Sequence, residues 1–279
     1  MTMDELHDQL FQLLCEIDDI CKRNGVRYFL DSGTEIGAAR EKDFVPWDDD
    51  VDIKVLREDY PAFRAALQRE LPDTIRFVEP DQFSPMFYDF ISRVQFKDLP
   101  MRAETEEDRS YQNFQNRVGV DVFVFDRAPA GKMAQTLLRL RCKILYGMGM
   151  SKRYRIADAK YTFGQKAAVA VLRLMGKPFS AQWICHRWER VVGAWQKQET
   201  GWRFASNYSV EHLHVFPESW YADTAFLTIR GRKFPVPAGY DEELTAIYGD
   251  YMKPPADKSQ YRTHVQIENS ETENKLSLI

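Results

Sequence analysis

The 279-residue sequence predicts an α+β fold, and three observations support that prediction. Residues 4–24 carry leucines and isoleucines at the spacing of an amphipathic helix. Short runs rich in β-branched and aromatic residues then alternate with helical segments up to about residue 130. A long helical stretch follows over 131–200, so helices and strands are partly segregated along the chain.

Local patterns justify each element in turn. Asn24-Gly25 ends the first helix, because this dipeptide favours a turn, and a short buried strand follows at 26–31. The next elements are expected in chain order as a short helix at 34–40, a strand at 49–55, a helix at 57–71, strands at 75–79 and 90–96, a solvated connection at 101–117 and a strand at 118–126. Residues 226–237 predict a strand pair that turns at Gly231.

These elements predict three parts of the chain. A core occupies 1–130, a basic helical insertion occupies 131–200, and a C-terminal segment, 201–279, packs back on the core. The insertion is called basic because residues 131–177 carry eleven Lys or Arg residues against one acid, Asp158. The whole chain has a net charge of −4, so this asymmetry indicates one face that meets an anionic partner.

Composition places the protein among globular chains. Hydrophobic residues make up 44% and charged residues 29%, and no apolar run reaches the roughly 18 residues of a membrane span. The acidic, amphipathic start is unlike a signal peptide, and the four cysteines form no CxxC pair. We therefore expect a cytoplasmic protein with free thiols.

Residues 46–55, "PWDDDVDIKV", hold four carboxylates within five positions. Alternate side chains of a strand share a face, so Val51, Ile53 and Val55 are expected in the core. Asp50 and Asp52 would then lie side by side on the other face, where they can share a hard cation such as Mg²⁺. An exposed strand end with ordinary surface acids is the alternative for an isolated pair.

A third acid occurs in similar company. Asp121 is flanked by Val120 and Val122, which are expected to point into the core. The side chain of Asp121 should therefore point to the other face of the strand. A neighbouring strand could bring Asp121 beside Asp50 and Asp52. Three converging acids of this kind bind the metal ions of phosphoryl-transfer sites.

A small turn precedes these acids. Ser32, Gly33 and Thr34 lie between a strand and a helix start, where backbone N–H groups can bind phosphate. The same turn is also an ordinary helix cap. Arg40 and Lys42 follow it, and together they predict a phosphate cradle with a cationic clamp beside the metal ligands.

The stretch "GTEIGAAREKDFVPWDDDVDI" resembles the LicD family of phosphotransferases, which carry G-T-x-x-G-A-x-R followed by F-[IV]-P-W-D-D-D-[IV]-D. "VDVFVFD" is similar to the family's downstream aspartate strand. "FPESWY" and "RKFPVPAGYDEELTAIYGDYMKPP" resemble its C-terminal signature. The resemblance runs from about Leu14 to Pro255, but 131–200 matches no motif of the family.

The resemblance implies a nucleotidyltransferase-like mixed sheet in the core and transfer of an alcohol phosphate from a CDP-activated donor. The donor would be CDP-choline or a similar compound such as a CDP-linked ribitol. The acceptor would be a hydroxyl of a cell-surface or lipid-linked glycan or teichoic acid. Asp50, Asp52 and Asp121 correspond to the family's acids and would hold Mg²⁺ or Mn²⁺, with Asp121 also taking the acceptor proton. Ser32, Gly33, Thr34, Arg40 and Lys42 would bind the donor phosphates.

Some residues depart from the family pattern. Glu35 stands where an apolar residue is common, "EKD" at 41–43 replaces a basic residue followed by glycine, and Val124 often corresponds to proline. Glu35 and Asp43 add negative charge near the cradle, which leaves the donor open.

Two other functions remain open at this point. The first is nucleotidyl transfer from a nucleoside triphosphate, which releases pyrophosphate instead of CMP. The second is a non-catalytic scaffold that binds glycan or membrane. The aliphatic and cationic residues of 131–177 also predict possible peripheral contact with the inner face of the membrane. No nucleic-acid-binding motif is present, and we expect no nucleic-acid partner.

Overall fold

A central strand, β5 (Gly119–Arg127), organises the fold of the computed structural model, which describes residues 1–153, 163–205 and 214–254. The other strands of the sheet are β1 (Phe29–Leu30), β2 (Val51–Leu56), β3 (Ile75–Val78), β4 (Ser92–Phe96), β6 (Trp202–Ala205) and β7 (Val215–Pro217). β5 pairs in parallel with β2 on one edge, and antiparallel with β4 and β6 on the other. One parallel pair among antiparallel ones makes the sheet mixed, which fits the predicted α+β class.

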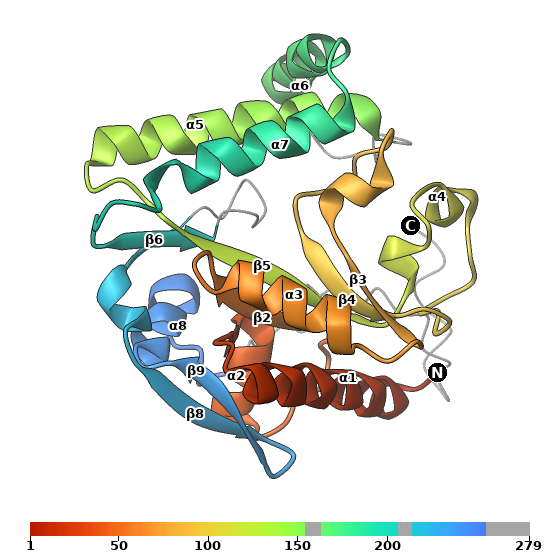
Figure 1. Ribbon diagram of the computed structural model, residues 1–279, viewed down its shortest axis with the longest axis vertical. Helices are drawn as coiled ribbons and strands as arrows, with labels where there is room; N and C mark the ends of the chain where they lie inside the picture. Colours follow the sequence, from red (N-terminus) through yellow and green to blue (C-terminus); the bar gives the residue numbers. More distant parts are fainter. Residues whose placement is uncertain (154–162, 206–213, 255–279) are drawn as a thin grey trace.

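Two helices, α1 (Met3–Asn24) and α3 (Tyr60–Glu70), lie beside the sheet in Figure 1. Val51, Ile53 and Val55 of β2 are fully buried in one cluster with the apolar residues of α1, as their alternation predicts. α1 ends at Gly25, whose φ of 62° is the left-handed conformation that favours glycine. The predicted helix end at Asn24-Gly25 is therefore confirmed.

Helix α2 (Ser32–Arg40) contacts β2, and helix α8 (Tyr240–Tyr248) contacts α2. The hairpin of β8 (Thr224–Ile229) and β9 (Arg232–Pro237) packs on α1 and β1 and turns at Gly231, where φ is 81°. The strand pair predicted around Gly231 is confirmed. Segments that lie some two hundred residues apart in the sequence therefore cover the same part of the sheet (Figure 1).

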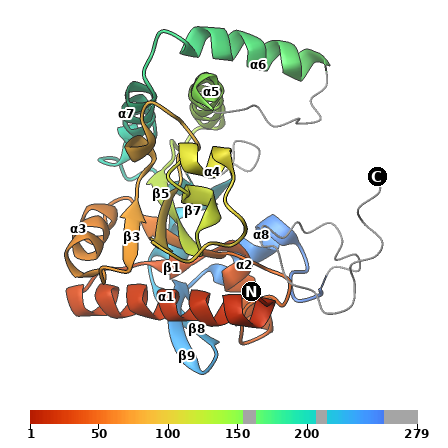
Figure 2. The ribbon, with the colours of Figure 1, turned by 90° about the vertical axis from the view of Figure 1, so that its right-hand side faces the viewer.

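Three helices lie together at one end of the molecule, and α6 is the outermost of them in Figure 2. They are α5 (Lys132–Gly149), α6 (Phe163–Gly176) and α7 (Ala181–Val192). α5 and α7 share a small apolar core with residues that precede β4, and the rings of Phe90 and Trp188 stack at 3.8 Å between centroids. After α7 the chain returns to the sheet as β6 and β7.

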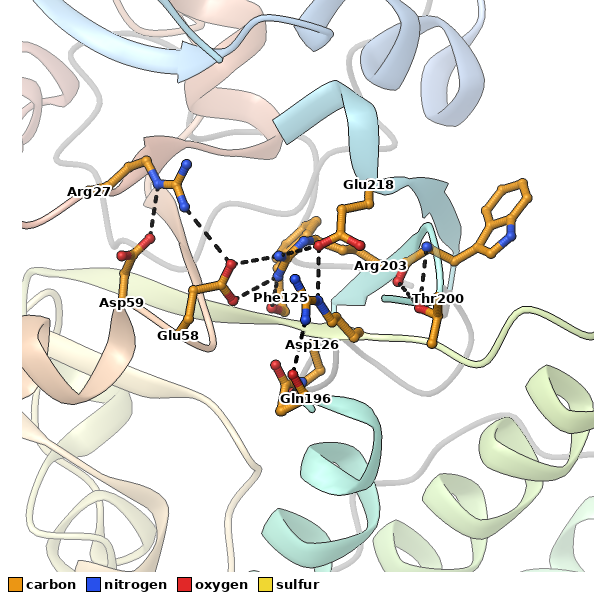
Figure 3. A network of polar contacts seen from close by, with 11 residues as sticks. Arg27, Glu58, Asp59, Phe125, Asp126, Gln196, Thr200, Arg203 and Glu218 are labelled. Carbon is orange, nitrogen blue, oxygen red and sulfur yellow. Dashed lines mark hydrogen bonds and ion pairs between the residues drawn. The ribbon is translucent and has the colours of Figure 1, made fainter. Parts of the chain in front are cut away.

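A network of ion pairs fastens β6 to the carboxyl end of β5 (Figure 3). Arg203 of β6 binds Glu58 at 2.6 Å and Glu218 at 2.7 Å. The fully buried Asp126 of β5 accepts a hydrogen bond from Gln196 at 2.8 Å. Because these partners come from four separate segments, the network links the helical stretch and the C-terminal strands to the core.

The segment 101–117 differs from its prediction as a solvated connection. It contains the short helix α4 (Glu106–Ser110), and Tyr111 and Phe114 are buried. Their rings pack edge-on against Phe83, at 6.3 and 4.7 Å between centroids. The segment was predicted to be exposed because most residues around Tyr111 and Phe114 are polar.

Lys54 of β2 is fully buried on the face of the sheet opposite to the α1 core. Its ammonium group lies 3.0 Å from Asp31, 3.1 Å from Glu35 and 2.8 Å from Glu243. Lys54 therefore connects β2 to the N-terminus of α2 and to α8. Glu35, the departure from the family pattern, is therefore paired inside the protein.

Replacing Lys54 with methionine should destabilise the protein by about 3–5 kcal/mol, because three buried carboxylates lose their countercharge. Chemical denaturation measures the free energy of unfolding. Lys253→Met, which removes an exposed lysine paired with Asp250, is the matched control and should change little. Equal stabilities for the two variants would contradict this role of Lys54.

Candidate active site

The pairing of β2 with β5 sets two of the predicted acids side by side. Asp52 lies directly opposite Asp121 in the parallel register, and Asp50 immediately precedes β2. Asp121 is largely buried, whereas Asp50 and Asp52 are partly exposed. The charges of Asp50 and Asp121 both act on Asp52, so the three carboxylates are close enough to interact strongly.

The preceding loop adds acids that the prediction did not include. Asp48, Asp49 and Asp50 have ligand oxygens within 4.8 Å of one another, whereas the predicted set of Asp50, Asp52 and Asp121 does not meet that spacing among the described residues. His7 fixes this loop, because its Nε2 lies 2.7 Å from the carbonyl oxygen of Asp48. The run of three aspartates in the sequence could have predicted this cluster.

Gly33 explains how this loop approaches the helix α2. A Cβ atom on Gly33 would lie 2.2 Å from a carboxylate oxygen of Asp48, well inside van der Waals contact. Only glycine therefore lets the Asp48 carboxylate keep this position against the first turn of α2. The predicted turn at Ser32–Thr34 therefore lies in direct contact with the acidic loop.

The carboxylates of the loop are crowded and poorly solvated. Burial, together with the charge of Asp50, raises the pKa of Asp48 to about 8. Burial and the neighbouring charge of Asp121 raise the pKa of Asp50, and burial raises that of Asp52 well above its ordinary value. Hard carboxylate oxygens crowded in this way match the donor set that Mg²⁺ and Mn²⁺ prefer.

Asp121 has a partner that sequence reasoning missed. Arg93 of β4 lies opposite Asp121 in the sheet and binds both of its oxygens, with Nη2 at 2.8 Å from Oδ2. This two-point pair holds the Asp121 carboxylate in a fixed orientation beside a buried guanidinium group. The sequence offered one indication of this pair, since Arg93 is a charged residue within the predicted strand 90–96.

The first turn of α2 is bonded directly to β2. Thr34 accepts a hydrogen bond through Oγ1 from the backbone N–H of Asp52 at 2.9 Å. The backbone N–H of Asp31 donates to the carbonyl oxygen of Asp52 at 3.0 Å. The side chain of Asp31 caps the helix by accepting from Ser32 N–H at 2.9 Å. The structure thus brings Ser32, Gly33 and Thr34 to the acids.

Arg40 and Lys42 lie at the other end of α2. Arg40 donates to the carbonyl oxygen of Tyr251 at 2.8 Å and lies over the ring of Trp47. Lys42 donates to the carbonyl oxygen of Ala39 at 2.8 Å, at the C-terminus of the helix. The structure does not bring either residue to the turn at Ser32, so their binding of phosphate stays a prediction.

His212 and His214 alternate along the chain, a spacing that metal ligands can have. His212 lies outside the described residues. His214 stacks on Phe216 with 5.9 Å between the ring centroids, which is a packing contact.

Comparison with known proteins shows what this site is similar to. Residues 25–138 match the model described as LicD/FKTN/FKRP, nucleotidyltransferase domain, and this range contains both β2 and β5. The lipopolysaccharide cholinephosphotransferase LicD of Haemophilus influenzae is 26% identical over 273 residues, which cover 95% of this chain and 97% of that protein.

A second relative is similar over a short stretch only. The ribitol 5-phosphate transferase FKRP of Homo sapiens is 54% identical over 35 residues, which are 12% of this chain and 7% of that protein. The family match, the near full-length similarity to a bacterial relative and the motif at residues 33–53 all agree. Residues 25–138 are thus similar to the nucleotidyltransferase domain of the LicD/FKTN/FKRP model, and nearly the whole chain is similar to a LicD protein.

Proposed function

We propose that the protein transfers a phosphoalcohol, phosphocholine or a similar group, from a CDP-activated donor to a hydroxyl of a cell-surface glycan or teichoic acid. The observation that carries this proposal is the register of the parallel pair β2–β5, which sets Asp52 opposite Asp121 with Asp50 beside them. This arrangement of acids on adjacent strands suits a nucleotidyltransferase-like core that handles a diphosphate.

Asp50, Asp52 and Asp121 would hold Mg²⁺ or Mn²⁺, with Asp48 adjoining them. The cation would neutralise the charge of the donor diphosphate, which phosphoryl transfer requires more than covalent chemistry. Arg93 orients Asp121 and adds a positive charge beside the acids. The turn of α2 fixes Asp52 through Thr34 and keeps the acidic loop close through Gly33.

The reaction balances as a substitution at phosphorus. The acceptor oxygen forms a bond to the phosphorus that carries the alcohol, and the bond from that phosphorus to the oxygen of CMP breaks. The hydroxyl proton passes to a carboxylate of the acidic cluster, and CMP leaves. Nucleotidyl transfer from a triphosphate would need the same acids, so only the released product separates the two reactions.

We also propose that the helices α5 and α6 contact the inner face of an anionic membrane, near a lipid-linked acceptor. Large apolar side chains are exposed there, with Met133 at 86%, Val171 at 58% and Leu174 at 65%. Lysines and arginines lie among them, as in interfacial helices. None of the described helices is long and apolar enough to cross a membrane.

Asp50→Asn and Asp52→Asn should each lower turnover by about 100-fold or more, because each removes charge from the proposed metal site. Release of CMP from a CDP-alcohol measures turnover. Asp43→Asn is the matched control, since Asp43 lies in the same segment but pairs with Arg230, and it should keep activity. Thermal unfolding of each variant confirms the fold. Substantial activity of Asp52→Asn would refute the proposal.

Incubation with CDP-choline, Mg²⁺ and a glycan acceptor should release CMP in step with the phosphodiester formed. Chelation of the metal with EDTA should lower the rate by about 100-fold, and added Mg²⁺ should restore it. Chromatography of the nucleotides is the readout. Pyrophosphate released from a nucleoside triphosphate, without CMP from any CDP-alcohol, would favour nucleotidyl transfer instead.

Vesicles that contain anionic phospholipid should bind the protein, and vesicles of phosphatidylcholine alone should bind it weakly. The double change Val171→Glu and Leu174→Glu should lower the bound fraction about five-fold, because it places charge on the apolar contact. Vesicle flotation is the measurement. Phe226→Glu changes an exposed residue of β8 as a control, and equal losses in both would argue against contact through α6.

A further inference from the structure

Two adjoining hollows of about 190 and 270 Å³ form one groove between α5 and α7. Arg141 of α5 and both Arg187 and Val191 of α7 line the two hollows alike. Leu138 and Leu145, which are buried in the apolar core between these helices, also line the groove. None of its lining residues belongs to the sheet or to α2, so the groove is separate from the candidate active site.

The charged residues of this groove are all cations. Arg141, Arg187 and Arg190 line it, and no acidic residue does so within the part of the chain that the structure describes. The same part of the chain contains no ion pair of these three arginines, and Glu189 of α7 pairs with Arg57 instead, at 2.7 Å. Three guanidinium groups are therefore left to bind an anion from outside the described chain.

The spacing of these arginines is unfavourable without an anion. Arg187 and Arg190 are three residues apart on α7, so they are neighbours on one face of the helix, and like charges in such positions repel. Arg141 adds a third positive charge from the facing helix. An anion bound in the groove would offset this repulsion.

An exposed apolar stripe borders the arginines. Met133, Leu137 and Leu140 of α5 are exposed and follow one another at helical spacing, and Leu137 also lines the groove. On α7, the exposed Trp183 precedes Arg187 by four residues, so the two share a face. Hydrocarbon and positive charge therefore meet along the groove, which suits an anion that carries an apolar chain.

A phosphate monoester matches the number of cations. The planar guanidinium group binds phosphate oxygens through two parallel hydrogen bonds. A phosphate monoester carries a charge of about −1.5 to −2 at pH 7, whereas a phosphodiester carries a single charge. Three arginines without a neighbouring acid therefore favour the monoester.

We infer that the groove between α5 and α7 binds one molecule of a lipid that ends in a phosphate monoester. Arg141, Arg187 and Arg190 would hold the phosphate, and the hydrocarbon would lie along the stripe at Leu137. The inference goes beyond the proposed contact of α5 and α6 with an anionic membrane. That contact needs only net charge and exposed apolar surface, whereas this groove selects a head group.

Other anions fit the groove less well. Inorganic phosphate would satisfy the arginines but would leave the apolar stripe in water. A nucleic acid offers phosphodiesters, each with one charge, and no hydrocarbon chain to cover Leu137. The experiment therefore has to separate the charge of the head group from the contribution of the chain.

Calorimetry with short-chain lipids, at concentrations where they are monomeric, tests the inference without a membrane. Dihexanoyl phosphatidic acid should bind one molecule per chain, about five-fold or more tightly than dihexanoyl phosphatidylglycerol, which has the same chains on a phosphodiester. Inorganic phosphate should bind about ten-fold more weakly than the phosphatidic acid, because it buries no hydrocarbon.

Arg141→Gln and Arg187→Gln should each weaken binding of the phosphatidic acid about five-fold. Lys143→Gln is the matched control, since it removes one positive charge from an exposed position of α5 outside the groove, and it should change the affinity by less than about two-fold. The three changed residues are exposed, so thermal unfolding of the variants should match that of the unmodified chain.

Three results would overturn the inference. They are equal affinity for the two lipids, equal losses in Lys143→Gln and Arg187→Gln, and inorganic phosphate that binds as tightly as the phosphatidic acid. The assay contains neither vesicles nor nucleotide. Failure of the inference would therefore leave the proposed membrane contact and the transfer reaction standing, and failure of either of those would leave binding in the groove untouched.

Discussion

The structure depends on a local concentration of negative charge at the start of β2. Asp48, Asp50 and Asp52 are held together although burial and mutual repulsion raise the pKa of each. None of the three has an ion pair with a lysine or arginine among the described residues. The proposed cation would offset the cost of holding these acids together.

The surrounding framework keeps these acids in place. The parallel register with β5 fixes Asp52, and Thr34 bonds to its backbone from α2. His7 holds the loop from α1, and Gly33 leaves the space that Asp48 occupies. Two buried cations flank the acidic region, because Arg93 pairs with Asp121 and Lys54 pairs with Asp31, Glu35 and Glu243.

Short-range patterns in the sequence predicted much of this arrangement. The helical spacing of α1, the alternation of Val51, Ile53 and Val55, and the turn at Gly231 are all local signals, and the structure has each of them. Family resemblance pointed to Asp121, and the register places it opposite Asp52.

Contacts between distant segments could not be predicted in this way. Arg93 pairs with Asp121 across 28 residues, and Glu243 reaches Lys54 from a helix near the end of the described chain. Arg40 and Lys42 were grouped with the turn because they are near it in sequence, but a helix separates them from Ser32. Tyr111 and Phe114 are buried because of tertiary packing that their polar neighbours did not indicate.

The central claim is that the acids of β2 and β5 bind a divalent cation in the resting protein. Titration of the metal-free protein with Mn²⁺, followed by electron paramagnetic resonance, counts the bound ions directly. The account predicts saturable binding by the unmodified chain and its loss in a variant with Asp50 and Asp52 both changed to asparagine. Equal Mn²⁺ binding by the two proteins would contradict it.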